Sequence, residues 1–331
     1  MKNGKVSESV LKRSILKQLH TKNEHVLLGA AVGEDAAVVR MAEGQLAIFS
    51  SALVDIPVSE VSTLAKLVVA RCINNVVCSG AKPVGIMVDV LVPTLWNEAS
   101  LRQLMKEIDR CAQQEGVQVT GGHTQVTRAV KDAVVTASGI GKVAEHSWIK
   151  NSSVKPGMDI IVTKWIGLEG TALLAMEKAE ELGQRYAAPF IDKAKQYIDY
   201  LSIQSEAAVA GQSGAAGMHD VSEGGIFGAL WEMAEASGVG LEIDLKKIPI
   251  RQETVEISEF FDVNPYKLAG TGSLIIISED GNKIVREIEK AGGKATIVGL
   301  TTDSNDRVLI QGEERRFLET AQTDELLKII R

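Results

Sequence analysis

Apolar positions recur at two spacings along the chain, and they predict a protein of mixed helices and strands. Spacings of three or four residues predict helices at 7–19, 60–79, 97–114, from about 171, and at 190–201, 204–211, 224–236 and 281–291. Short apolar runs predict strands at 36–40, 46–50, 84–92, 117–120, 133–140, 159–163, 241–244, 273–278, 295–300 and 307–310. Residues 121–124 are predicted as a loop. Strands that alternate with helices indicate an α/β organisation.

The length of 331 residues and one polar segment predict two domains. The segment 151–157 contains Pro156-Gly157, a turn-forming pair typical of a junction. We therefore predict an amino-terminal domain over 1–154 and a carboxy-terminal domain over 155–331.

Charge and cysteine content narrow the class of protein. The formal charge is −7, from 36 basic and 43 acidic residues, and the absence of a Lys/Arg run argues against a nucleic-acid partner. No apolar run approaches a membrane span, and no secretory segment precedes the first helix, so a cytoplasmic protein is expected. Cys72, Cys78 and Cys111 form no C-x-x-C pair and are expected to be buried small hydrophobic residues.

Two clusters of acids and glycines carry the candidate chemistry. The first is Gly33-Glu34-Asp35, directly before a predicted strand, and the second is Met218–Gly225, directly before a predicted helix. Carboxylates beside flexible backbone can hold a divalent cation, and amides at the start of a helix can receive phosphate. Each cluster alone is equally consistent with a turn. Together they suggest a nucleotide–metal site.

An ordered series of short motifs resembles the aminoimidazole ribonucleotide synthetase superfamily, in particular the hydrogenase maturation protein HypE and proteins related to AIR synthase. The series is Gly4-Lys5, Gly33–Val38, Asn74-Asn75 with Gly80–Pro83, Thr120–Thr124, Pro156-Gly157 with Ile160–Val162, Met218–Gly225, and Ala234–Val239 with Ile243 and Ile248-Pro249. The resemblance covers nearly the whole chain, and the order of the motifs is more specific than any one of them.

The resemblance implies a two-domain PurM-like fold, with an α/β amino-terminal domain and a larger α+β carboxy-terminal domain. It also implies that two amino-terminal sheets join into a barrel-like homodimer. ATP is expected in a cleft near the dimer interface, with Mg²⁺ held by acidic loops.

Carried onto this sequence, the resemblance assigns Glu34, Asp35 and Asn75 to the metal. Lys5, His123 and Asp220 are the candidate catalytic groups. The cofactor is expected to contact Gly33, Glu34, Asp35, Asn75, Gly121, Gly122, His123, Ser222, Gly224 and Gly225. Two of these residues keep a second interpretation: His123 can instead stabilise its loop, and Lys5 can belong to a solvated tail. Ser222 is also expected to cap the following helix.

The chain departs from the family pattern at several positions. Ala52 stands where relatives carry an acid, Asn75 replaces an aspartate, and His123 replaces the usual acid of its motif. HypE carries its substrate group on a terminal cysteine, whereas this sequence ends Leu327–Arg331, so that self-carrying reaction is expected to be absent.

These features predict an ATP-binding protein that activates a small amide-like or phosphorylated substrate, as an ATP-dependent ligase, kinase or dehydratase-like enzyme. The alternative is a nucleotide-sensing or metalloenzyme-maturation scaffold without turnover, working with a maturation partner.

Overall fold

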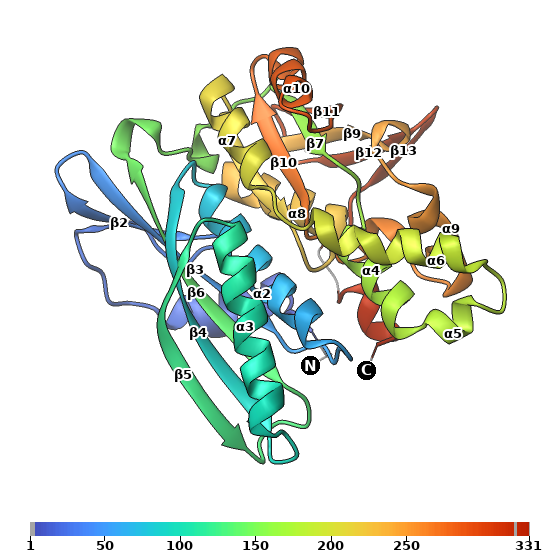
Figure 1. The fold of residues 1–331 in the computed structure, drawn as a ribbon. Helices are drawn as coiled ribbons and strands as arrows, with labels where there is room; N and C mark the ends of the chain where they lie inside the picture. Colours follow the sequence, from blue (N-terminus) through green and yellow to red (C-terminus); the bar gives the residue numbers. More distant parts are fainter. Residues whose placement is uncertain (1–3, 321–322, 331) are drawn as a thin grey trace.

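The computed structural model describes residues 4–320 and 323–330, and it contains two mixed sheets with helices packed against them (Figure 1). The first sheet has the order β1-β2-β3-β6-β4-β5. Its strands are β1 (Val26–Leu28), β2 (Ala37–Ala42), β3 (Gln45–Val54), β6 (Val134–Ala144), β4 (Lys82–Pro93) and β5 (Gln118–Thr127). Only β4 and β5 pair in parallel.

Two helices, α2 (Val61–Val77) and α3 (Glu98–Gln114), cover one face of the first sheet (Figure 1). Along β3 the buried residues alternate with exposed ones, so Ile48 and Val54 face the core while Phe49 and Leu53 do not. The face away from α2 and α3 therefore carries exposed apolar side chains.

The second sheet has seven strands in the order β13-β12-β9-β11-β7-β10-β8. They are β13 (Glu314–Phe317), β12 (Arg307–Gln311), β9 (Gly240–Asp244), β11 (Ala295–Thr302), β7 (Asp159–Thr163), β10 (Ser273–Ser278) and β8 (Gly217–Val221). Its helices are α4 (Leu168–Glu177), α5 (Ala179–Leu182), α6 (Ala188–Lys195), α7 (Gln204–Ser213), α8 (Gly225–Ser237), α9 (Gln252–Phe260) and α10 (Gly281–Lys290).

The neighbouring strands β7 and β10 of this sheet are buried on both faces, which explains their unbroken apolar sequences. Ile161 and Ile276 join a core cluster with α4, α7 and α10, whereas Ile160 and Ile277 join a second cluster with α8. The first of these clusters also contains Ile73 of α2, so one core continues across the predicted domain boundary.

Most predicted elements are present, and the clearest exception is the loop predicted over 121–124, which is wrong. Those residues continue β5 because they pair in parallel with β4, after a register shift between Ile86 and Met87. Gly122 has φ +143° and a Cβ there would lie 1.8 Å from the Val88 carbonyl oxygen, so a glycine is needed for this close approach. β1, β8, β13 and α9 are not predicted by the sequence pattern.

The two ends of the described chain meet. The first described residues lead into a short, irregular helical segment: α1 (Glu8–Val10), a π-helical turn (Leu11–Ile15) and a 3₁₀ turn (Leu16–Gln18). The last segment contains a 3₁₀ turn over Glu325–Lys328. A Cβ on Gly4 would lie 2.7 Å from the Leu327 side chain, and in Figure 1 the N and C marks lie side by side. Among the described residues, no helix is long and apolar enough to cross a membrane.

Candidate functional site

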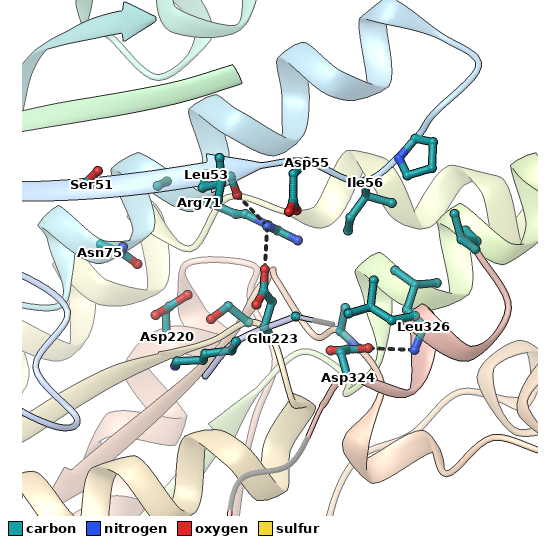
Figure 2. Close-up of a pocket in the computed structure, with 18 of the residues that line it drawn as sticks. Ser51, Leu53, Asp55, Ile56, Arg71, Asn75, Asp220, Glu223, Asp324 and Leu326 are labelled. Carbon is teal, nitrogen blue, oxygen red and sulfur yellow. Dashed lines mark hydrogen bonds and ion pairs between the residues drawn. The ribbon is translucent and has the colours of Figure 1, made fainter. Parts of the chain in front are cut away.

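A cavity of about 660 Å³ lies where the two sheets and the two chain ends meet. The first domain contributes Leu53 and Asp55 at the end of β3 and Arg71 and Asn75 from α2. The other walls come from the carboxy-terminal domain and the chain ends, through Lys5, Asp220, Ser222, Glu223, Asp324 and Leu326 (Figure 2). Groups distant in sequence therefore converge on one space.

Asn74 and Asn75 are neighbours on α2, but their side chains make different contacts. Asn74 is fully buried, donates to the Leu201 carbonyl at 2.8 Å and accepts from the Ile203 amide at 3.1 Å, so it ties α2 to the second domain. Asn75 lines the cavity, where its amide nitrogen donates to Asp220 Oδ1 and to the Arg71 carbonyl, both at 3.2 Å. Only Asn75 is placed to contact a ligand.

Asp35 is paired with a histidine that the sequence analysis did not single out. His219 Nδ1 lies 2.6 and 2.7 Å from the two Asp35 carboxylate oxygens, and its Nε2 lies 3.3 Å from Glu232. Burial alone would lower the pKa of His219, but Asp35 and Glu232 raise it well above its usual value. The two carboxylates therefore favour the protonated form of the imidazole that lies between them.

Glu232, on α8, contacts two basic side chains, His219 and Lys5. Besides His219 it contacts Lys5, whose Nζ lies 2.5 Å from Glu232 Oε1. Burial alone would raise the pKa of Glu232, but His219 and Lys5 lower it to about 2. Lys5 is thus anchored at the cavity by a carboxylate that stays ionised.

Asp220, at the end of β8, carries an unsatisfied oxygen. The residue is 3% exposed, and its Oδ2 has no hydrogen-bond partner in the described part of the chain. Burial, and then the nearby Asp35 charge, raise the pKa of Asp220 to about 7. A buried acceptor without a donor costs about 1–3 kcal/mol, so this atom is suited to receive a ligand.

Arg71 joins the two domains through a buried ion pair. Its guanidinium donates to Glu169 on α4 at 2.5 Å and to the Leu53 carbonyl at 2.9 Å, and it contacts Glu223 at 3.3 Å (Figure 2). Glu169 is fully buried, whereas Glu223 is partly exposed. Glu223 is therefore the weaker partner and the one a ligand could replace.

The glycines before α8 allow a tight turn, but Ser222 does not cap the helix. Gly224 is the capping residue with φ +84°, and no side-chain cap bond forms within the turn, so the predicted Ser222 cap is wrong. A side chain near the other end of the chain binds this turn instead: Asp324 accepts hydrogen bonds from the amides of Gly224 at 2.7 Å and Ala269 at 3.2 Å. Burial raises the pKa of Asp324 to about 7 despite these amide donors.

The structure brings some predicted site residues together and separates others. Lys5, Asn75, Asp220 and Ser222 line the cavity, and Asp35 lies behind its wall, where it accepts a hydrogen bond from the Asp220 amide at 3.4 Å. Gly33 has φ +76°, and a Cβ there would lie 2.1 Å from the Glu232 carbonyl oxygen, so this glycine lets the Asp35 loop reach α8. Gly224 and Gly225 shape the turn behind Ser222.

Glu34 faces a different space from Asp35. It lines a separate cavity of about 360 Å³ with Arg40, Trp148 and Lys150. Burial and the Asp35 charge raise the pKa of Glu34 to about 7. The predicted trio of Glu34, Asp35 and Asn75 is thus not gathered around one point in this structure.

The motif Gly121-Gly122-His123 lies on β5, the edge strand farthest from β1. His123 is on the same cross-strand row as Leu53, through Asp89 of β4 and Thr136 of β6. Three strand spacings separate Leu53 from His123, about 14 Å. His123 therefore faces the same side of the sheet as the Leu53 wall but is not among the lining residues of the cavity in a single chain.

Sequence reasoning missed the groups that pair with the predicted ones: Arg71, Glu169, His219, Glu232 and Asp324. His219 lies inside the quoted Met218–Gly225 motif, and its position directly before Asp220 was a usable signal. The others belong to helices or to the last segment, and only the tertiary structure shows that they meet.

Three relatives in sequence extend over most or a large part of the chain. A Methanocaldococcus jannaschii protein named for hydrogenase expression and formation is 27% identical over 93% of this chain and 91% of its own length. A Pyrococcus horikoshii thiamine-monophosphate kinase is 29% identical over 72% of this chain and 73% of its own length. A Rhodobacter capsulatus carbamoyl dehydratase HypE is 28% identical over 64% of this chain and 61% of its own length.

Solved structures of related chains have the same fold. A chain in the solved structure of a HypE–HypF complex has a TM-score of 0.76 at 22% identity, over 94% of this chain and 99% of that one. HypE in complex with ATP has a TM-score of 0.71 at 17% identity, over 98% of both chains. Residues 33–143 match the N-terminal domain, and residues 155–311 the C-terminal domain, of the AIR synthase related proteins. The chain belongs to the AIR synthase related protein family and has the two-domain PurM-like fold of HypE.

Proposed function

We propose that the chain binds ATP in the cavity between its two sheets and uses it to activate a small amide-like or phosphorylated substrate. The observation that carries this proposal is the convergence of Lys5, Asn75 and Asp220 on one cavity. These residues come from the first segment, α2 and β8; the family resemblance assigns Asn75 to the metal and the cofactor, and Lys5 and Asp220 to the catalytic groups. The HypE structure with ATP, which shares the fold, supports the choice of nucleotide.

The donor set fits Mg²⁺ when phosphate or water supplies part of the coordination shell. Asp35, His219 and Asp220 offer atoms within 4.8 Å of one another, and Asp220 Oδ2 is unsatisfied. Mg²⁺ prefers six oxygen ligands and commonly keeps waters and phosphate oxygens rather than a full protein cage. We propose that Asp35, Asp220 and the Asn75 amide oxygen hold it, while His219 is a poor ligand because its two ring nitrogens face Asp35 and Glu232. Mg²⁺ would neutralise phosphate charge.

The remaining groups serve positioning and charge, which supply most of the acceleration in phosphoryl transfer. Lys5 is held by Glu232 at the cavity, where its ammonium can contact a phosphate oxygen. Arg71 can exchange the partly exposed Glu223 for a second anionic oxygen while the buried Glu169 keeps it oriented. Asp220 is placed to accept a proton or a hydrogen bond from the substrate.

Calorimetry tests the proposal directly. We expect saturable ATP binding that tightens with Mg²⁺, and we expect Asp35→Asn to weaken the Mg²⁺-dependent part by roughly tenfold. Asp109→Asn, which changes an exposed acid on α3, is the matched control. Circular dichroism establishes that each variant is folded. Absence of binding at millimolar ATP by folded protein would contradict the proposal.

A second candidate is a nucleotide-sensing or maturation scaffold without turnover. Ala52 lines the cavity where relatives carry an acid, and the His219 cation reduces the negative charge that Asp35 offers to a metal. Turnover of ATP with candidate amides and phosphorylated substrates separates the two. ATP binding without product under any condition would favour the scaffold.

We also propose a cytoplasmic homodimer with the domain division at 154/155. The first sheet presents Phe49, Leu53 and Met87 at 39%, 47% and 48% exposure on its open face, which suits burial against a second copy. The HypE–HypF complex supports a maturation protein as a further partner.

A further inference from the structure

Four side chains form one continuous series of short contacts that ends at the cavity. His219 Nδ1 lies 2.6 Å from the Asp35 carboxylate, His219 Nε2 lies 3.3 Å from Glu232, and Glu232 lies 2.5 Å from the Lys5 ammonium. They come from four separate segments: the turn before β2, β8, α8 and the first segment. His219 and Glu232, called the bridge below, therefore link the proposed metal ligand to the proposed phosphate contact.

The bridge lies behind the cavity wall. Successive residues of a strand point to opposite faces, so on β8 His219 shares the face of Val221, which packs in the apolar cluster of α8. Asp220 points the other way, into the cavity (Figure 2). Among the described residues that line the cavity, neither His219 nor Glu232 is present. The bridge is thus placed to act on a ligand through the residues that it holds.

The series of contacts is buried at one end and open at the other. The side chains of His219, Asp35 and Glu232 are 4%, 10% and 15% exposed, whereas that of Lys5 is 46% exposed. Buried charges are screened less than exposed ones, so a change at one of the three buried groups is felt by the next. Lys5 keeps an accessible side for a ligand.

An imidazole suits this position because its two nitrogens are fixed on one rigid ring. A rotation that favours the contact with Asp35 weakens the contact with Glu232. Gly33 adds a second link, because a Cβ there would lie 2.1 Å from the Glu232 carbonyl oxygen. The Asp35 turn therefore rests on the backbone of the same residue whose carboxylate holds Lys5.

We infer that His219 and Glu232 are positioning residues, which fix Asp35 relative to Lys5 so that the metal and phosphate contacts form together. Groups behind a metal ligand orient it, and their loss commonly weakens metal binding. Mg²⁺ on Asp35 and phosphate on Lys5 then stabilise the same arrangement, so each contact strengthens the other. This inference rests on the proposed function, because it names residues that serve the same site.

Two substitutions divide the bridge at different atoms. His219→Asn places an amide nitrogen near the position of Nδ1 and keeps the contact with Asp35, whereas His219→Gln places one near Nε2 and keeps the contact with Glu232. Calorimetry measures how much Mg²⁺ tightens ATP binding in each protein, with and without Lys5→Ala. In the parent, Lys5→Ala should reduce this Mg²⁺ effect about threefold to tenfold. In both His219 variants it should leave the effect unchanged, because the link is already broken.

The control is His25→Gln, which changes an exposed histidine and should behave as the parent does. Circular dichroism establishes that each variant is folded. A second measurement keeps His219 in place and needs no nucleotide. In protein labelled with ¹⁵N-histidine, Lys5→Ala should shift the signals of both His219 ring nitrogens at constant pH, although Lys5 bonds to Glu232 and is one residue removed from the ring.

The outcomes separate this inference from the proposed function. A parent that binds MgATP, with the same effect of Lys5→Ala in all three backgrounds, overturns the inference and leaves the function standing. Ring signals that do not move in Lys5→Ala overturn the inference as well. A parent that binds no MgATP, with ring signals that do move, overturns the proposed function and leaves the link between Lys5 and His219 standing.

Discussion

At the scale of single residues, the turn before α8 requires a glycine that adopts a positive φ angle and leaves room for nearby carbonyl oxygens. Gly225 has φ +61°, and a Cβ there would lie 2.7 Å from the carbonyl oxygens of Leu268 and Tyr266. Gly238, at the other end of α8, has φ +70° with nothing within 4 Å of the same point. The two positions share the left-handed conformation and differ in the space around it.

This difference makes a matched pair of substitutions informative. Gly238→Ala should lower the free energy of unfolding by about 1 kcal/mol through backbone strain alone. Gly225→Ala should lower it by about 2 kcal/mol more, because the carbonyls must also move. Urea denaturation measures both. Equal losses in the two variants would show that close approach has no role at Gly225.

A second residue-scale prediction concerns pH. The pKa of Asp324 is raised to about 7 in the folded protein, so the folded state binds a proton that the unfolded state releases above about 4. The contribution of this residue to stability therefore falls as pH rises from about 4 to 7. Asp324→Asn removes the charge. Between pH 4 and pH 8, the free energy of unfolding of the variant should therefore rise by about 2–4 kcal/mol relative to that of the parent. Urea unfolding at both pH values checks this; a pH-independent difference would refute it.

At the scale of elements, the first helical segment is held mainly by charges. Residues 8–18 bury no side chain within α1 or its two following turns, yet Lys12 pairs with Glu235 at 2.7 Å and Trp231 donates to Glu8 at 2.6 Å. Partly exposed ion pairs of this kind contribute little and weaken with salt. This segment should therefore be the first to detach from α8.

Limited proteolysis tests that expectation. Trypsin cleavage after Lys12, Arg13 and Lys17 should be faster at high salt. In Lys12→Ala, which loses the first of these sites, cleavage after Arg13 and Lys17 should be faster still. Cleavage after Lys290 at the end of α10, which belongs to a well-packed helix, should respond much less, and it serves as the internal reference. Salt-independent cleavage of the first segment would show that apolar contacts hold it instead.

The helices and strands also show which parts of the structure the sequence could predict and which it could not. The apolar runs of β7 and β10 were placed at their observed bounds because strands buried on both faces leave an unmistakable pattern. The strand over Gly121–Thr124 was missed because two glycines indicate a loop unless a neighbouring strand is known. Likewise the sequence predicts Asp35 and Asp220 as site residues. It does not predict His219 and Glu232, because their contacts form only when β8 and α8 lie beside the Gly33 turn.

At the scale of the whole molecule, the open face of the first sheet predicts association. Phe49 and Met87 lie on β3 and β4 and are exposed on the side away from α2 and α3. In the proposed dimer a second copy covers these two side chains. The same arrangement would allow His123 of one copy to approach the cavity of the other. Replacing both Phe49 and Met87 by glutamate places charges in the apolar contact and should abolish the dimer.

Light scattering coupled to size-exclusion chromatography measures the mass. The parent is expected at twice the 35.5 kDa chain mass and the double glutamate variant at the chain mass. Exposed Leu300, on the second sheet, supplies the control, because Leu300→Glu should leave the mass unchanged. A monomeric parent would rule the dimer out.

The apolar core that crosses the domain boundary should make the two domains unfold together. Leu67 and Ile73 of α2 share one apolar cluster with Ile161 of β7 and Leu168 of α4. Amide groups in α2 and in β7 should therefore exchange with deuterium at similar slow rates, through one cooperative opening rather than two. A ligand that binds at the junction would slow exchange in both halves together, including strands that it never touches.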